Sequence, residues 1–148
     1  MLNRRDMVRT GLAFVALTGV ARAAEEAAPK PAAGADSSDT QQAFAKALGH
    51  CVIAGTECLQ HCLTALGTGD TSLAECSKTV RDMLAVCGAE QILVLGESRR
   101  AKTTVRLCID VCTDCEAACR KHEAHHAVCK ACADACAATI TAARAFVA

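Results

Sequence analysis

Cysteine is the residue type in this chain whose number and spacing most clearly indicate chemistry. The chain has 148 residues, of which 12 are cysteine. Seven of them, with three histidines, lie in residues 108–136, which read CIDVCTDCEAACRKHEAHHAVCKACADAC. Thiolate sulfur binds soft metal ions, and paired thiols form disulfides or exchange electrons. The pattern therefore predicts metal binding or thiol redox chemistry.

The segment 39–148 has the composition of α-helices, and these helices must position the cysteines. It contains no proline and little alternation of period two, and it is rich in Ala, Leu, Glu, Lys and Arg. Polar breaks at 67–70, 96–98 and 122–126 divide it into four segments. Because short connections make neighbouring helices antiparallel, we predict an all-α fold, an antiparallel four-helix bundle.

Polar residues that cap helix N-termini support three of the four predicted starts. Ser38 or Asp39 is placed to cap the first helix. Ser72, followed three residues later by Glu75, has the capping-box pattern for the second helix. Ser98 is placed to cap the third helix.

The cysteines of each predicted helix fall on one face when the chain is wound at 3.6 residues per turn. They span about 40°, 20°, 60° and 60° on the first to fourth helices. Apolar residues continue each of these faces, so the faces should point inward and the thiols should line the bundle core. The cysteines predicted to line the core are Cys51, Cys58, Cys62, Cys76, Cys87, Cys108, Cys112, Cys115, Cys119, Cys129, Cys132 and Cys136.

Several different explanations could account for a core lined with thiols. Cysteine is a small, readily buried residue, although 12 of them exceed what packing needs. Disulfides suit an exported protein, but a bridge within one helical turn restrains the unfolded chain little. The C-x-x-C pairs at 112–115 and 129–132 suggest zinc or an iron–sulfur cluster, although such pairs usually lie on loops. A thiol redox protein would place a strand near such a pair, and neither pair has one predicted beside it.

Cu(I) is the metal ion that fits the spacing most directly. It is a soft ion that selects thiolate and thioether ligands, and it accepts two or three sulfurs. Each C-x-x-x-C pair on a helix could therefore hold an ion, and stacked pairs could hold many ions along one axis. The metal-free form could still fold, because neutral thiols pack as apolar groups.

Three further residues are candidate ligands beside the cysteines. Met83 lies on the cysteine face of the second helix and offers either a thioether ligand or simple packing. His122 and His125 each lie within four residues of a cysteine of the core face, at the turn between the third and fourth helices. They could bind the last ion, pass copper in or out, or belong to a solvated turn. His50 and His61 are predicted to flank the cysteine faces, and His126 is predicted to point into solvent.

Residues 1–23 resemble a cleaved twin-arginine export signal. Arg4 and Arg5 precede an uncharged stretch that ends in an A-x-A-like site at 21–23. The apolar run is too short for a membrane span, which needs about 20 residues. Residues 24–38 contain both prolines and are expected to form a flexible tail. We therefore expect export to the periplasm of a protein whose single domain, 39–148, is already folded.

Composition argues against nucleic acid as a partner. The chain has no Trp and no Tyr, and its formal net charge at pH 7 is zero. Base stacking and phosphate recognition therefore have few side chains to work with.

From about residue 40 to the C-terminus, the cysteine pattern resembles that of the bacterial copper storage proteins. Its most specific parts are CTDCEAAC and CKACADAC. Members of that family are cysteine-rich four-helix bundles that hold many Cu(I) ions, and its exported branch carries a twin-arginine signal. The resemblance implies that all twelve cysteines are copper ligands, that the protein stores or detoxifies copper without catalysis, and that it forms homotetramers. The second helix departs from the dense pattern, since it has only two cysteines.

Overall fold

The structure of residues 35–148, with side chains from Ser37 onward, is given by a computed structural model. It contains four helices, α1 (Ala35–Gly67), α2 (Ala74–Leu95), α3 (Ala101–Arg120) and α4 (Ala127–Val147). No strand occurs within this part of the chain, so the all-α prediction is confirmed. The predicted export signal 1–23 and most of the tail 24–38 lie outside the described residues.

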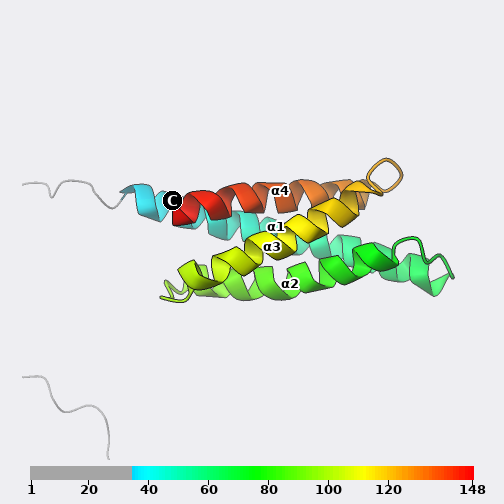
Figure 1. Ribbon diagram of the computed structural model, residues 1–148, viewed down its shortest axis with the longest axis horizontal. Helices are drawn as coiled ribbons and strands as arrows, with labels where there is room; N and C mark the ends of the chain where they lie inside the picture. Colours follow the sequence, from blue (N-terminus) through cyan, green and yellow to red (C-terminus); the bar gives the residue numbers. More distant parts are fainter. Residues whose placement is uncertain (1–34) are drawn as a thin grey trace, which may run out of the picture. The chain divides into compact units, whose positions relative to one another are not determined.

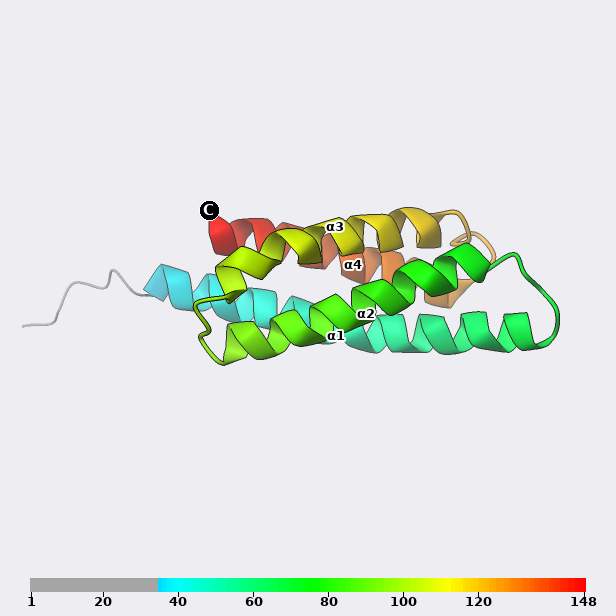
Figure 2. The ribbon, with the colours of Figure 1, turned by 60° about the horizontal axis from the view of Figure 1, so that its bottom comes forward.

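The four helices form an antiparallel bundle (Figures 1 and 2). α1 packs against α2 and α4, and α3 packs against the same two helices, so α1 and α3 lie on a diagonal. Short loops at 68–73, 96–100 and 121–126 connect successive helices. Two of these loops, 68–73 and 121–126, lie at one end of the bundle, which we call the thiol end. The 96–100 loop lies at the other end, which we call the apolar end.

None of the four helices is long and apolar enough to cross a membrane; this finding covers only the described part of the chain.

The helix starts differ from the predicted capping at all three positions. α1 begins at Ala35, ahead of both residues predicted to cap it. The capping box of α2 is absent, because the backbone N–H of Ser72 binds the Asp70 carboxylate at 2.9 Å and α2 starts after Leu73. The Ser98 hydroxyl accepts the backbone N–H of Arg100 at 3.2 Å, but α3 starts after Arg100 and has no side-chain cap.

The core is divided along its length into a thiol half and an apolar half. All twelve cysteines have no exposed surface, which confirms the predicted cysteine-lined core. Towards the apolar end the thiols give way to hydrocarbon side chains such as Leu48, Val94 and Ile140. There the rings of Phe44 and Phe146 pack with centroids 5.3 Å apart. The apolar half closes one end of the thiol column with residues that offer a metal ion no ligand.

Two buried polar side chains, Glu90 and Thr139, mark the boundary between the halves. Thr139 is fully buried and donates its hydroxyl to the backbone carbonyl of Ala135 at 2.9 Å. Glu90 is only 1% exposed and accepts a hydrogen bond from the Thr104 hydroxyl through Oε2. Its other oxygen, Oε1, has no hydrogen-bond partner within the described residues. Burial raises the pKa of Glu90, so the neutral acid is favoured more than in water.

Candidate metal centre

The innermost thiols form a four-sulfur group in which Cys87 is central. Its Sγ lies 3.6 Å from that of Cys108 and 3.4 Å from that of Cys112. The sulfurs of Cys51, Cys87 and Cys112 all lie within 4.8 Å of one another. The group draws on α1, α2 and α3, because the helical spacing of each directs its cysteine to the axis.

The middle of the column joins α3 and α4. The Sγ atoms of Cys115 and Cys132 are 3.8 Å apart, and Cys136 lies within 4.8 Å of both. Cys136 is also 3.7 Å from the Sγ of Cys51, which connects this group to the innermost one. The two C-x-x-C pairs therefore belong to a longer ladder and do not form a separate four-cysteine site.

The outermost thiols gather around Cys58 of α1. Its Sγ lies 4.0 Å from both Cys76 and Cys119 and 3.9 Å from Cys129. Cys76 and Cys119 are 3.4 Å apart. The sulfurs of Cys58, Cys119 and Cys132 also lie within 4.8 Å of one another, so the outer and middle groups share members.

The thiol column is therefore continuous, and its spacing suits bridging metal ions better than isolated sites. All twelve cysteines are free thiols. A disulfide bond is about 2.0 Å long, well below the sulfur–sulfur distances observed here. Two sulfurs bound to one ion through bonds of about 2.3 Å lie at most about 4.6 Å apart. Every cysteine except Cys62 has a neighbouring sulfur at 3.4–4.0 Å, within that limit.

Close packing of the thiols makes their ionisation unequal. Hydrogen bonds from Cys119 and Cys58 lower the pKa of Cys76 to about 3. Burial raises the pKa of Cys62 to about 12 and that of Cys129 to about 11, and the charge of Cys76 adds to both shifts. A thiolate is thus stabilised where neighbouring thiols donate to it, while those neighbours hold their protons. A bound cation would relieve this competition by neutralising the thiolates.

Met83 lies against the thiol column, as its position on the second helix predicted. Its Sδ is 3.4 Å from the Sγ of Cys51, and the side chain is fully buried. Gly55 of α1 provides the space, because a Cβ at that position would lie 2.5 Å from the Met83 methyl carbon. The geometry permits both thioether ligation and packing.

Histidines cover the thiol end, but in a different combination from the predicted one. The Nε2 of His61 and the Nδ1 of His126 are 2.9 Å apart, and both rings are partly buried. The ring of His122 lies edge-on to His126, with centroids 6.3 Å apart. His125 is exposed. The prediction that His126 points into solvent is wrong, because the 121–126 loop turns it towards α1. No spacing rule based on a single helix could have paired it with His61.

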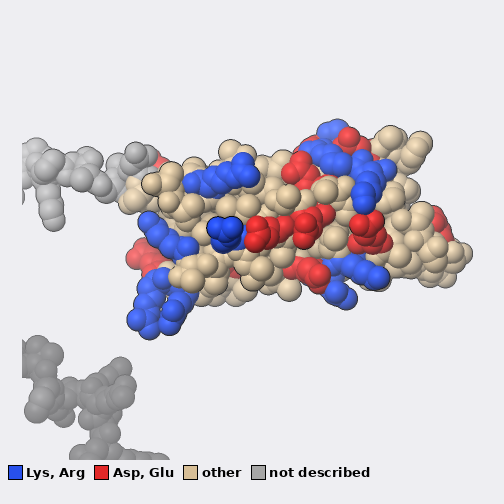
Figure 3. All heavy atoms as spheres, viewed as in Figure 1, with Lys and Arg blue, Asp and Glu red and all other residues tan. Residues whose placement is uncertain are grey.

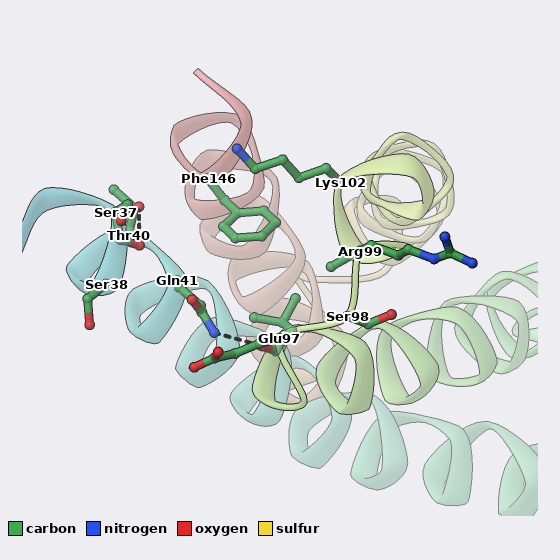
Figure 4. A pocket seen from close by; sticks show the side chains of 11 residues that line it. Ser37, Ser38, Thr40, Gln41, Glu97, Ser98, Arg99, Lys102 and Phe146 are labelled. Carbon is green, nitrogen blue, oxygen red and sulfur yellow. Dashed lines mark hydrogen bonds between the residues drawn. The ribbon is translucent and has the colours of Figure 1, made fainter. Parts of the chain in front are cut away.

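A surface pocket of about 540 Å³ lies at the apolar end, where the start of α1 meets the end of α4. It is lined by polar and charged side chains together with Val94, Ala101 and Phe146, and none of the lining residues is a cysteine (Figure 4). Gln41 crosses to α2 there and donates to the backbone carbonyl of Val94 at 2.8 Å (Figure 4). This pocket is separated from the thiol column by the apolar half of the core.

The fold and the site together define a class of protein, a four-helix bundle whose core is a column of thiols with the spacing to hold metal ions. Residues 37–148 match the protein-family model described as copper storage protein. The chain belongs to this family, which is a storage family and not a family of enzymes. A comparison with curated proteins gave no match.

Proposed function

We propose that this protein stores many Cu(I) ions through the cysteine thiolates of its core. The observation that carries the proposal is the continuous column of twelve buried free thiols. Within the described residues these thiols outnumber every other buried group that could bind a metal. A soft ion of low coordination number is the cargo best matched to such a column, since each ion needs only two or three sulfurs.

The twelve cysteines are the proposed ligands, and Met83 is a further candidate at the inner end. If most thiolates are shared between neighbouring ions, the column holds on the order of ten or more ions. Copper binding displaces thiol protons, so the thiolate charge and the copper charge offset each other inside the bundle. The metal-free protein stays folded because its neutral thiols pack as apolar groups.

The thiol end is the proposed route for copper. The apolar half of the core offers no ligand, whereas the thiol end carries imidazoles beside the last cysteines. His61, His122 and His126 are placed to receive an ion and to pass it to the outermost thiols. His125, on the same loop, is a weaker candidate for this role because it is exposed.

The cellular setting is also proposed. We infer that residues 1–23 direct export through the twin-arginine pathway to the periplasm. The exposed Ile92 and Leu95, at 74% and 64%, support assembly into a homotetramer. The stored copper then serves recipient copper enzymes, or the protein removes excess copper.

Removing two ligands tests the proposal. We expect the double variant Cys115→Ala, Cys119→Ala to lose a few ions of copper capacity while remaining a folded helical bundle. The control is Thr113→Ala on the exposed face of α3, which should bind as much copper as the wild type. Copper per chain is counted by elemental analysis after removal of weakly bound metal, and circular dichroism reports the fold. Unchanged copper content in the double variant would count against the proposed ligands.

A further inference from the structure

The loop that covers the thiol end, residues 121–126, is connected to the helices by specific side-chain interactions. Its last residue, His126, bonds His61 of α1. Its first residue, Lys121, forms an ion pair with Glu75 of α2 at 3.1 Å. A third interaction involves Glu123, in the middle of the loop. It is held by Arg120, the last residue of α3.

Arg120 binds three carboxylates from three different parts of the chain. Its Nη1 lies 2.9 Å from Glu123 in the loop and 2.7 Å from Asp134 of α4. Its Nη2 lies 3.2 Å from Glu116, one turn earlier in α3. The planar guanidinium group presents several donors in a fixed fork, so one side chain can hold three acceptors in a way that a lysine cannot. Figure 3 shows basic and acidic side chains gathered over this end of the bundle.

The position of Arg120 in the sequence ties this cluster to the thiols. Arg120 directly follows Cys119, and Asp134 lies between Cys132 and Cys136. The ion pair therefore joins the outer faces of the two helices that carry seven of the twelve cysteines. Through Glu123 it also fixes the loop that bears the histidines.

We propose that Arg120 is a positioning residue for copper exchange, which holds the 121–126 loop over the outermost thiols and so limits the rate at which copper enters and leaves. The inference rests on the proposed copper storage function. Arg120 binds no copper itself and leaves the number of ions unchanged. Its influence is on the opening of the loop, because the Arg120–Glu123 ion pair must break before the middle of the loop can move away from α3. The release rate of the ions nearest the thiol end should be affected most.

The test is the rate of copper release from the loaded protein to an excess of Cu(I) chelator under anaerobic conditions. We expect Arg120→Met to hold as many ions as the wild type and to release the first of them about five- to tenfold faster. The release rate of Arg120→Lys should lie between those of the wild type and Arg120→Met, because an ammonium group replaces only some of the hydrogen bonds of the guanidinium group. The control is Arg81→Met on α2, whose guanidinium pairs with the adjacent Asp82 and is 67% exposed. It should release copper at the wild-type rate.

Two further readouts separate positioning from general weakening of the bundle. Raising the salt concentration should accelerate release from the wild type more than from Arg120→Met, because only the wild type has the ion pairs to screen. In the metal-free proteins, a thiol reagent should modify the first one or two thiols faster in Arg120→Met. A variant that was merely less stable would release all ions faster and would unfold at a lower temperature.

Equal release and equal thiol modification in wild type and Arg120→Met would overturn the inference and leave the storage function intact. Faster release with equal salt dependence would also overturn it. A wild-type protein that bound only one or two ions would overturn the storage function itself, and the inference with it.

Discussion

Glu90 gives the sharpest prediction about stability, because it places an incompletely satisfied carboxyl group inside the bundle. Oε1 has no partner within the described residues, while Oε2 has one, the Thr104 hydroxyl. Replacement by methionine removes the buried charge and keeps a long side chain. The Thr104 hydroxyl keeps an acceptor in the variant, the backbone carbonyl of Arg100 at 3.1 Å. We therefore expect Glu90→Met to stabilise the metal-free protein by about 1–3 kcal/mol near pH 7.5.

The sign of the pH dependence follows from the direction of the pKa shift. Burial raises the pKa of Glu90, so the folded protein holds this proton more tightly than the unfolded chain. Protonation of Glu90 contributes fully to the stability of the folded wild type below the unfolded-state pKa of about 4.3. This contribution is lost as the pH rises through the folded-state pKa. The stability difference between Glu90→Met and the wild type should therefore grow as the pH rises from about 4.

Denaturant unfolding of the reduced, metal-free proteins from pH 4.5 to 8 measures this difference. Glu57→Met, at an exposed position on α1, is the matched control and should change the stability by no more than about 0.5 kcal/mol. If the wild type proved as stable as Glu90→Met at pH 7.5, or if the difference did not vary with pH, the account of Glu90 as a buried, destabilising acid would be refuted.

Two other predictions concern the column itself. Gly55→Ala should displace the Met83 side chain, because the new Cβ would lie 2.5 Å from its methyl carbon. We expect this displacement to cancel the gain of about 1 kcal/mol that replacing a helical glycine by alanine normally gives, and a thermal midpoint raised by that full gain would contradict the close packing. Copper affinity should fall as the pH is lowered, because protons compete with the copper ion for the thiolates. Burial strengthens this competition by raising the pKa of Cys62 to about 12 and that of Cys129 to about 11. Chelator competition at pH 6 and pH 8 measures this effect, and equal affinity at both values would be the contrary result.

The bundle and its thiol core were predictable because they depend on helical periodicity alone. Four cysteines at spacings of four, three and four, as in 108–119, must share one face of a helix. The same rule could have found Glu90, which lies three residues after Cys87 and four before the buried Val94.

Features that depend on loop conformation were not predictable in this way. The pairing of His61 with His126 requires the 121–126 loop to fold back over α1. The pattern of Ser72 and Glu75 predicted a capping box, but the Asp70 carboxylate binds the Ser72 backbone instead. Both conformations depend on which of several local hydrogen bonds forms, and a helical wheel does not represent this competition.

The division of the core into two halves fits the proposed storage of copper. The apolar half, with its packed Phe44 and Phe146 rings, supports the fold without taking part in metal binding. The thiol half can then change its charge and its ligand geometry as ions are added or removed. A store built in this way stays folded both empty and full.

Anaerobic titration of the reduced, signal-free protein with Cu(I) tests the central claim most directly. Thiolate-to-metal absorbance follows binding, and a competing chelator counts the tightly held ions. If neighbouring ions share the thiolates as proposed, the absorbance keeps rising to on the order of ten or more ions per chain. Saturation at one or two ions, together with few free thiols in the denatured protein before reduction, would contradict it and would favour a disulfide-stapled helical module.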